Sequence, residues 1–457
     1  MFLNHRILLT IVILVAAILA CKTPSQSIST PEVTTTIRSV ENTAVVLQST
    51  TQSLITPLVT PGATQEITAS TPDLTDDLLI VYTKDNNLWR WTKNGVLQLT
   101  TSADVYSPHI SPDGSVVAYL RPIDDFHIEL WATNIDGTNT RRLVSISDLD
   151  SIGAAKRDPS AVAIIPHQFE WIPDTLSLAF NTRQLFQGPG MELLNDLNMV
   201  GFNSGIITTV LAPGNGGMFY YAPNASRVAI VQPSKILLTN LDGSESRELL
   251  IYDPVITYSE YRYYAQPVWS TGSDFMRVAI PPADPLADPA LPTEIWTLTV
   301  EDAPAEQTGT VIASPFFEAP VSISPDLSRL AYIRSEAQTG EYIKDLMIAA
   351  VDGGGEWFYS KGQALDFEAW SPDSTHFAFV SGENMQGWLG GLDISPTPLS
   401  QDPTGVLSVN WIDAARFVYV QQQPGGFGIF LGSPGKPPIP IDTTTGSPPS
   451  LDFYLKT

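Results

Sequence analysis

The stretch Trp370-Ser371-Pro372-Asp373, followed by the apolar run Phe377-Ala378-Phe379-Val380, decides the fold because copies of it recur along the chain. Two close copies begin at Ser111-Pro112-Asp113-Gly114 and at Ser324-Pro325-Asp326. Proline fixes φ and aspartate bonds nearby backbone amides, so each copy is predicted to be a tight turn between antiparallel strands. A residue repeated in every unit is better explained as a turn former than as a catalytic or metal-binding group. This structural interpretation applies to Asp113, Asp326 and Asp373.

Weaker copies of the turn extend the repeat through most of the chain. The residue before each turn falls at positions 110, 171, 221, 269, 323, 370 and 411, a spacing of roughly 50 residues. Downstream of three of these turns, Asp-Gly pairs at 136–137, 242–243 and 352–353 mark a second hairpin. Two hairpins per repeat give four strands, and four-stranded units at this period predict the blades of a β-propeller.

This pattern resembles the TolB-like, WD-repeat-like propellers, whose blades carry a Trp-Ser-Pro-Asp-Gly turn followed by an Ala-Phe or Ala-Tyr strand. The resemblance covers residues 78–457. It implies an all-β fold, a β-propeller of four-stranded blades.

The two ends of the repeat region predict how the ring closes. Residues 78–99 contain three strands without a clear first one, whereas Leu451-Asp452-Phe453 echoes Leu365-Asp366-Phe367, which opens an earlier blade. We therefore expect the C-terminal strand to complete the first blade, which gives eight blades and removes open sheet edges. A seven-bladed ring is the alternative. A rival for closure is that Thr71-Pro72-Asp73 is a degraded turn and the first blade is complete by itself.

Composition agrees with this fold and excludes one class of partner. Hydrophobic residues make up 43% and charged residues 16% of the chain, with 37 prolines and 31 glycines, which favours many short strands joined by turns. The formal net charge of −24 repels phosphate backbones, so nucleic-acid binding is not expected. The acidity fits solubility, cations or a basic partner.

The N-terminus has the features of a secretion signal. Arg6 precedes an apolar run over residues 7–19, which is too short to cross a bilayer permanently and is typical of a signal peptide over residues 1–20. Ile18-Leu19-Ala20-Cys21 resembles a bacterial lipobox, which implies diacylglycerol on the thiol of Cys21 and cleavage before it. The alternative is an uncleaved anchor with an incidental cysteine. Cys21 is the only cysteine, so an intramolecular disulfide is impossible.

The lipobox resemblance implies attachment to the membrane in the bacterial cell envelope, on the extracytoplasmic side, in a leaflet that the sequence leaves open. Residues 21–75 are rich in Ser, Thr and Pro and lack aromatic residues, so we expect a disordered tether. Residues 76–457 are predicted to form the propeller, which we expect to be monomeric.

One face of the propeller is predicted to carry the function. Strands alternate in direction, so the tight turns share one face and the other connections share the opposite face. Long loops on a rigid scaffold are often functional. The long insertions all fall in the second class of connection, at 145–166, 181–198, 252–265, 281–293, 335–343 and 381–388.

Aromatic residues concentrate in one of these insertions. Tyrosine combines an apolar ring with a polar tip, which suits protein or carbohydrate partners. The alternative is that the rings only order their own loop. The candidate binding residues are Tyr252, Tyr258, Tyr261, Tyr263 and Tyr264, with Phe126, Phe186 and Trp388 in neighbouring loops.

Signals for catalysis or metal binding are weak. The sequence has no Gly-x-Ser-x-Gly, Walker or His-Glu-x-x-His motif. Asp284 and Asp288 are interpreted as turn caps rather than cation ligands, and the scattered histidines form no ligand pattern. We therefore expect a non-catalytic scaffold that binds an unknown protein or glycan, with no metal, cofactor or catalytic residue. The alternative is a propeller-fold glycoside hydrolase or lyase with paired carboxylates in the central funnel.

Overall fold

The computed structural model describes residues 74–456, apart from 103, 189, 339–340 and 402–403. The predicted signal peptide, Cys21 and the tether up to residue 73 lie outside the described residues. The described part belongs to one compact unit, residues 70–457.

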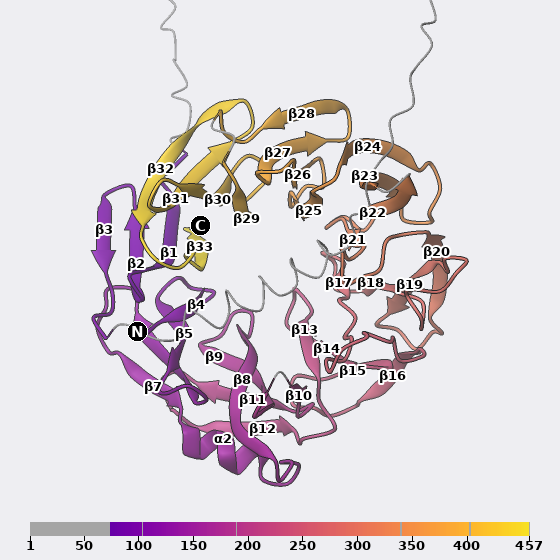
Figure 1. Ribbon diagram of the computed structural model, residues 1–457. Coiled ribbons are helices and arrows are strands. Elements are labelled where there is room, and N and C mark those ends of the chain that lie inside the picture. The colour runs from indigo at the N-terminus through magenta and orange to yellow at the C-terminus, as the bar shows by residue number, and fades with distance from the viewer. Residues whose placement is uncertain (1–73, 103, 189, 339–340, 402–403, 457) are drawn as a thin grey trace, which may run out of the picture. The chain divides into compact units, whose positions relative to one another are not determined.

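Within the described residues, the strands form eight antiparallel sheets arranged as the blades of a β-propeller (Figure 1). The prediction of an all-β propeller with eight four-stranded blades is confirmed, and the seven-bladed alternative is wrong. Blade 3 carries one additional short strand, β10.

Each blade runs from a first strand beside the centre of the ring to a last strand at its rim (Figure 1). Blade 1 contains β33 (Leu451–Leu455), β1 (Leu78–Lys84), β2 (Asn87–Thr92) and β3 (Gly95–Gln98). Blade 2 contains β4 (Tyr106–Ile110), β5 (Val116–Pro122), β6 (Ile128–Asn134) and β7 (Arg141–Val144). Blade 3 contains β8 (Ala161–Trp171), β9 (Ser177–Phe186), β10 (Met191–Leu193), β11 (Leu197–Gly201) and β12 (Ile207–Leu211), and the helix α2 (Ile146–Gly153) precedes it. Blade 4 contains β13 (Met218–Tyr221), β14 (Val228–Gln232), β15 (Lys235–Thr239) and β16 (Arg247–Ile251).

The second half of the ring repeats this order. Blade 5 contains β17 (Val268–Trp269), β18 (Phe275–Ile280), β19 (Thr293–Thr299) and β20 (Glu306–Val311). Blade 6 contains β21 (Ser322–Ile323), β22 (Arg329–Gln338), β23 (Glu341–Ala350) and β24 (Trp357–Gly362). Blade 7 contains β25 (Leu365–Trp370), β26 (His376–Ser381), β27 (Gln386–Gly391) and β28 (Ile394–Pro398). Blade 8 contains β29 (Val406–Trp411), β30 (Phe417–Gln423), β31 (Gly426–Ser433) and β32 (Lys436–Thr444).

The C-terminal strand closes the ring. β33 pairs antiparallel with β1, with Phe453 opposite Ile80 and Leu451 opposite Tyr82. The expected closure is therefore confirmed, and the rival of a self-contained first blade is wrong. Closure pairs the inner edge of β1, which otherwise exposes unbonded backbone groups.

The aspartate of the repeated turn closes the turn with its carboxylate. In the turn between β25 and β26, Asp373 Oδ1 accepts a hydrogen bond from Ser371 Oγ at 2.6 Å and from the Thr375 amide at 3.3 Å. In their own turns, Asp113 and Asp326 accept hydrogen bonds from the equivalent serine hydroxyl and the equivalent downstream amide. These hydrogen bonds stabilise the ionised carboxylates and hold their pKa values below the usual range, against the effect of burial.

Tryptophans at the ends of first strands connect neighbouring blades. Trp171 Nε1 donates to the backbone oxygen of His109 in the preceding blade at 2.9 Å. The same bond recurs from Trp269 to Tyr220 at 3.0 Å and from Trp411 to Ala369 at 3.3 Å. Sequence reasoning recognised these tryptophans only as markers of the repeat.

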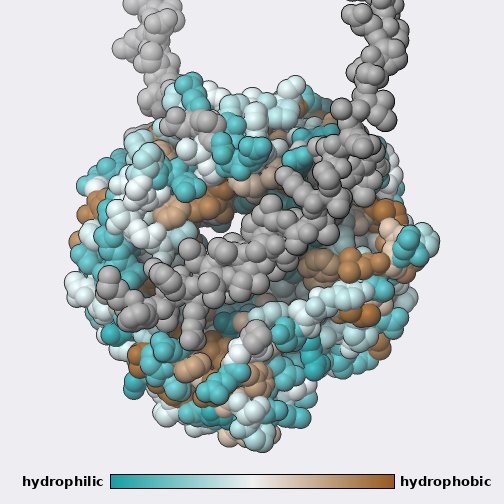
Figure 2. Space-filling view, viewed as in Figure 1, coloured by the Kyte–Doolittle hydropathy of each residue, from teal (hydrophilic) through white to brown (hydrophobic). Residues whose placement is uncertain are grey.

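The hydrophobic core lies between the faces of neighbouring blades. One cluster, for example, joins Ile80 and Tyr82 of blade 1 to Val418 and Ile429 of blade 8. The space-filling view shows an opening at the centre of the ring (Figure 2). On the visible face, apolar residues form separate patches among polar ones. Among the described residues, no helix is both long and apolar enough to span a membrane.

Candidate ligand-binding face

The antiparallel order of each blade separates two faces. The turns between first and second strands and between third and fourth strands form what we call the tight-turn face. The other connections form the loop-rich face, and all six long insertions lie there. They are less loop-like than expected, because residues 161–166 belong to β8, residues 335–338 to β22 and residues 341–343 to β23.

The insertion before blade 3 is ordered by a helix. Ser145 is the N-cap of α2, and its side chain accepts a hydrogen bond from the Asp148 amide. The Asp148 carboxylate in turn accepts from the Ser145 amide, which completes a capping box. Leu149 is fully buried and packs into the core of blades 2 and 3.

The segment 252–267, which joins β16 to β17, is the most aromatic connection on the loop-rich face. Its start is fixed by Tyr252, whose hydroxyl donates to the Gln232 backbone oxygen at 2.8 Å. Its middle is fixed by the Ile256 amide, which donates to the Ala283 backbone oxygen at 2.8 Å. The segment therefore rests on blades 4 and 5 at defined points.

Two further tyrosines anchor the end of the same segment. Tyr263 donates to the Ala279 backbone oxygen at 3.3 Å, and its ring meets Phe316 edge-on at 4.7 Å. Tyr264 donates to Asn195 Oδ1 of blade 3 at 3.0 Å. Burial raises the pKa of both phenols, so their hydroxyls stay protonated as donors at neutral pH.

The remaining two tyrosines are exposed to solvent. Tyr258 is 57% exposed, and its hydroxyl donates to Asp284 Oδ1 at 2.6 Å. Tyr261 is 43% exposed. The structure thus divides the five tyrosines: Tyr252, Tyr263 and Tyr264 order the segment, while Tyr258 and Tyr261 present their rings to solvent.

Two hollows flank this segment and share Arg262 and Tyr264 as lining residues. The first, about 250 Å³, lies between the segment and residues 314–321 that lead into blade 6. The second, about 380 Å³, lies between the segment and the β9–β10 hairpin of blade 3. Phe316 and Tyr263 line the first hollow, and Phe186 and Tyr261 line the second. The volume of the second hollow falls within the range of small-ligand sites and that of the first lies slightly below it, and both hollows have aromatic lining.

Charge on this surface is balanced locally. Arg262 Nη2 lies 3.2 Å from Glu192 Oε1, which links the tyrosine segment to β10. Both side chains are substantially exposed, so this pair contributes little to stability. Sequence reasoning missed Arg262, although its place inside Tyr261-Arg262-Tyr263-Tyr264 is a visible signal.

The other aromatic candidates do not form one patch with the tyrosines. Phe186, at the end of β9, joins Tyr261 in the second hollow. Phe126 is 42% exposed in the connection of blade 2, and lines neither hollow. Trp388 lies in β27 rather than in a loop and stacks on Phe379, with ring centroids 6.5 Å apart. Blades 2 and 7 are at other positions in the ring, which separates these rings from the segment.

The acidic candidates of the 281–293 insertion lie in turns. Asp284 Oδ1 accepts from the Leu286 amide at 3.0 Å as well as from Tyr258. Asp288 precedes the cis-proline Pro289. Among the described residues, no three histidine, cysteine, aspartate or glutamate side chains are grouped so as to hold a metal ion.

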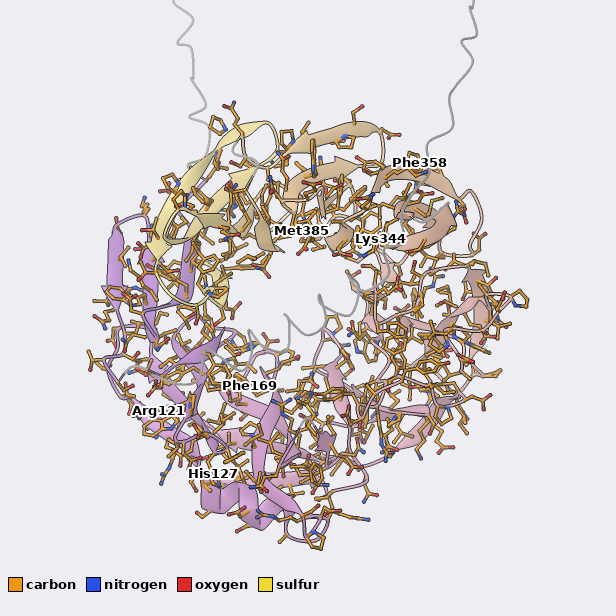
Figure 3. All side chains as sticks on the ribbon, in the orientation of Figure 1. Arg121, His127, Phe169, Lys344, Phe358 and Met385 are labelled. Carbon is orange, nitrogen blue, oxygen red and sulfur yellow. The ribbon has the colours of Figure 1, made fainter. Side chains whose placement is uncertain are left out.

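The histidines have separate environments. His109 meets Phe169 edge-on, with ring centroids 4.7 Å apart, and Phe169 lies beside the central opening (Figure 3). His127 Nδ1 lies 2.8 Å from Asp124, and His376 Nδ1 lies 2.8 Å from the Thr375 hydroxyl. His167 lines the second hollow, where burial and Arg183 lower its pKa to about 4.

The first strands, which lie beside the centre of the ring, carry carboxylates in blades 3 and 7. Glu170 of blade 3 accepts from Gln168 at 2.9 Å. Asp366 of blade 7 pairs with Lys344 of blade 6 at 2.9 Å, and Lys344 lies near the inner edge of the ring (Figure 3). Glu368, two residues further along β25, has its pKa raised to about 7 by burial and by Asp366. None of these carboxylates lines either hollow on the loop-rich face.

No protein-family model and no curated protein matches the chain. Solved structures resemble the chain at low identity. TolB from Acinetobacter baumannii is 12% identical with a TM-score of 0.32, covering 60% of this chain and 61% of that one, so the chain spans about three fifths of the TolB structure. Oligogalacturonate lyase from Vibrio parahaemolyticus is 11% identical with a TM-score of 0.44, covering 70% of this chain and 84% of that one. The β-propeller domain of the Trilobed protease from Pyrococcus furiosus is 12% identical with a TM-score of 0.42, covering 62% and 86%. Likeness of this degree says nothing about ligand or activity.

Proposed function

We propose that the protein is a lipid-anchored, extracytoplasmic scaffold of the bacterial cell envelope whose propeller binds a protein or glycan, without catalysis, through the loop-rich face. The observation that carries the binding proposal is the pair of adjoining hollows on either side of Arg262 and Tyr264. Tyrosine and arginine are the residue types that contribute most to binding surfaces. In this segment Tyr252, Tyr263 and Tyr264 are held in place by hydrogen bonds to blades 4, 5 and 3.

The position at which the chain enters the propeller agrees with this role. Residues 74–77 lead into β1 at its end on the tight-turn face, because β1 runs towards the loop-rich face. Arg416 holds this entry point, donating to the Leu74 backbone oxygen at 2.8 Å and to Asp77 at 2.6 Å. In the proposed arrangement, the tether joins the propeller on the tight-turn face, which leaves the opposite, loop-rich face free of the attachment point.

The inner carboxylates support a scaffold rather than a hydrolase. Glu170, Asp366 and Asp452 each bond a different group within the ring, and they come from three blades. A glycosidase of the usual kind needs two carboxyl groups on opposite sides of one bound sugar. The carboxylate that contributes to the raised pKa of Glu368, after burial, is Asp366 on its own strand.

The binding proposal is tested by capture from the native envelope with the full-length chain and two matched variants. Tyr261→Ser changes an exposed side chain on the loop-rich face, and Ile206→Ser changes a 68% exposed side chain on the tight-turn face. Binding of the same protein or glycan by wild type and Ile206→Ser, and its loss with Tyr261→Ser, is expected. Equal capture by all three chains contradicts the proposed face, and turnover of a glycan panel by the purified chain contradicts the non-catalytic role.

The lipid anchor is tested separately at Cys21. Cells that express the full chain are fed an alkyne-bearing palmitate, and the label on the protein is measured with its distribution between membrane and soluble fractions. The wild type is expected to carry the label in the membrane fraction. Cys21→Ser is expected to lose the label, and labelling that is unchanged in this variant contradicts lipidation at Cys21.

A further inference from the structure

Arg183 is a cation without an acidic partner among the described residues, and it lies behind Met191, which lines the second hollow. It lies in β9, paired with Ile165 of β8 on one side and Leu193 of β10 on the other, so its backbone is fixed within the sheet. The side chain is half-buried. Within the described part of the chain, no carboxylate oxygen lies within 4.0 Å of its guanidinium nitrogens.

The guanidinium has few acceptors of any kind. Arg183 Nη1 contacts Met191 Sδ at 2.8 Å, and a thioether is a weak acceptor. Arg183 Nε is buried and has no hydrogen-bond partner among the described residues. A guanidinium carries five N–H donors, and leaving buried donors unsatisfied is unfavourable. The Arg183 guanidinium can therefore donate a further hydrogen bond to a strong acceptor.

The groups around Arg183 are polar but uncharged. Tyr106 and Tyr261 lie close enough to interact electrostatically with the guanidinium. Burial raises the pKa of Tyr106 to about 12, so this phenol is neutral at physiological pH. His167 is also neutral there, because its pKa is lowered to about 4. One positive charge with neutral neighbours remains in this corner.

The second hollow lies next to this corner. His167, Met191 and Tyr261, all neighbours of Arg183, are among its lining residues. Met191 is the lining residue that contacts the guanidinium, and an unbranched methionine side chain readily changes conformation. A ligand oxygen that replaces Met191 Sδ gains a charge-assisted hydrogen bond in exchange for a weak one.

The other charges of the hollow favour a singly charged ligand. Arg262 pairs with Glu192, and Glu260 adds another carboxylate to the lining. A dianion such as phosphate is repelled by these two carboxylates, whereas a carboxylate matches the guanidinium fork with one charge. Phe186 and Tyr261 supply apolar surface for the rest of the ligand.

We infer that the second hollow is a carboxylate-recognition site in which Arg183, reached by displacement of Met191, bonds the carboxylate of an organic ligand. This inference deepens the proposed binding function and rests on it, because it names the ligand chemistry of the same face. The carboxylate can belong to an acidic sugar or to the C-terminus of a peptide, and the two sources are distinguished by experiment.

The test uses the full-length wild-type chain and two matched pairs of probes. Glucuronate is compared with glucose, and N-acetylphenylalanine with its amide, by calorimetry and by the ligand-induced shift in melting temperature. In at least one pair, the affinity for the acid is expected to exceed that for its neutral counterpart by about 10-fold or more. A difference of this size is typical of losing a hydrogen bond to a charged group. Binding of glucuronate alone indicates a sugar acid, and binding of N-acetylphenylalanine alone indicates a peptide terminus. If neither acid binds better than its neutral counterpart, the inference is wrong.

Variants then test which residues are responsible. Arg183→Met is expected to remove the preference for the acid. Met191→Ala is expected to retain or strengthen this preference, because the thioether no longer contacts Arg183 Nη1. Arg142→Met, which changes an arginine of blade 2 that pairs with Glu129, is the control and should bind as wild type does. Retained preference in a folded Arg183→Met protein overturns the assignment. Absence of acid binding by the wild-type chain, with intact capture from the envelope, contradicts this inference alone, whereas absence of capture by the wild-type chain contradicts the proposed function.

Discussion

The carboxylate of Asp452 accepts a hydrogen bond from the backbone amide of Ile110 at 2.7 Å, across 342 positions of sequence. Asp452 lies in β33, the strand that completes blade 1, and Ile110 ends the first strand of blade 2. The bond therefore connects the closing strand to the next blade as well as to its own. Burial raises the pKa of Asp452 despite this hydrogen bond. Closure of the ring depends on contacts of this kind at the last strand.

Removal of residues 451–457 is expected to destabilise the propeller. Leu451, Phe453 and Leu455 are partly buried against the core of blades 1 and 8. Burial of a side chain to this extent stabilises the folded state by about 1–2 kcal/mol. We expect the melting temperature to fall clearly in thermal unfolding, and a synthetic peptide of residues 449–457 to restore part of the loss. An unchanged melting temperature of the truncated chain contradicts closure by β33.

Gly353→Ala is expected to destabilise the packing between blades 5 and 6. Gly353 has a φ of +81°, and a Cβ there overlaps the Thr310 backbone oxygen of β20. Gly425 has a φ of +89° but open space around it, so Gly425→Ala measures backbone strain alone. We expect a loss of about 3 kcal/mol for Gly353→Ala and about 1 kcal/mol for Gly425→Ala, measured by denaturant unfolding. Equal losses would show that the inter-blade overlap is relieved at no cost.

The indole bond between blades is tested with a matched pair of tryptophans. Trp171 Nε1 bonds the His109 backbone oxygen, whereas Trp370 Nε1 is buried with no partner among the described residues. Replacing either tryptophan by phenylalanine removes the indole N–H and a similar side-chain volume. We expect Trp171→Phe to cost about 1 kcal/mol more than Trp370→Phe in unfolding free energy. A smaller loss for Trp171→Phe than for Trp370→Phe is the result that argues against the bond.

Glu368 gives the propeller a pH dependence. Burial, with a contribution from Asp366, raises the pKa of Glu368 from 4.5 to about 7 in the folded chain. Its stabilising contribution is complete below about pH 4.5 and is lost as the pH rises through about 7, because the folded state holds the proton more tightly than the unfolded state. Glu368→Gln stays neutral, so its stability relative to wild type should increase by about 1–3 kcal/mol between pH 5 and pH 8.

Thermal unfolding of both chains across this pH range checks the expectation for Glu368. Glu301→Gln, at an exposed position, serves as the control for a generic loss of charge. A constant difference between Glu368→Gln and wild type at all pH values would mean that Glu368 does not titrate in this range.

The fold could be predicted from sequence because its signals are local and repeated. Ser371-Pro372-Asp373 and its copies mark turns whose hydrogen bonds form within five residues, and repetition supplies the blade count. The match between 451–453 and 365–367 likewise predicted the closing strand. Each of these inferences needed only a comparison of short segments within one chain.

The site depends on relations between blades, which short segments do not reveal. Tyr264 bonds Asn195 of another blade, and the lack of an acidic partner for Arg183 among the described residues depends on what the ring places around it. Phe126 and Trp388 matched the tyrosines in chemistry, but the ring places them at other blades. The tyrosine segment itself was predicted, whereas the division into anchoring and exposed rings required the structure.

The most direct test of the loop-rich face is photo-crosslinking of the full chain in its native cells. A benzophenone amino acid is placed at Tyr258, 57% exposed on the loop-rich face, or at Ile206, 68% exposed on the tight-turn face. Irradiation is expected to give a discrete adduct from position 258 that is absent from position 206. An adduct from position 206 alone, or none from position 258, would contradict binding through the loop-rich face.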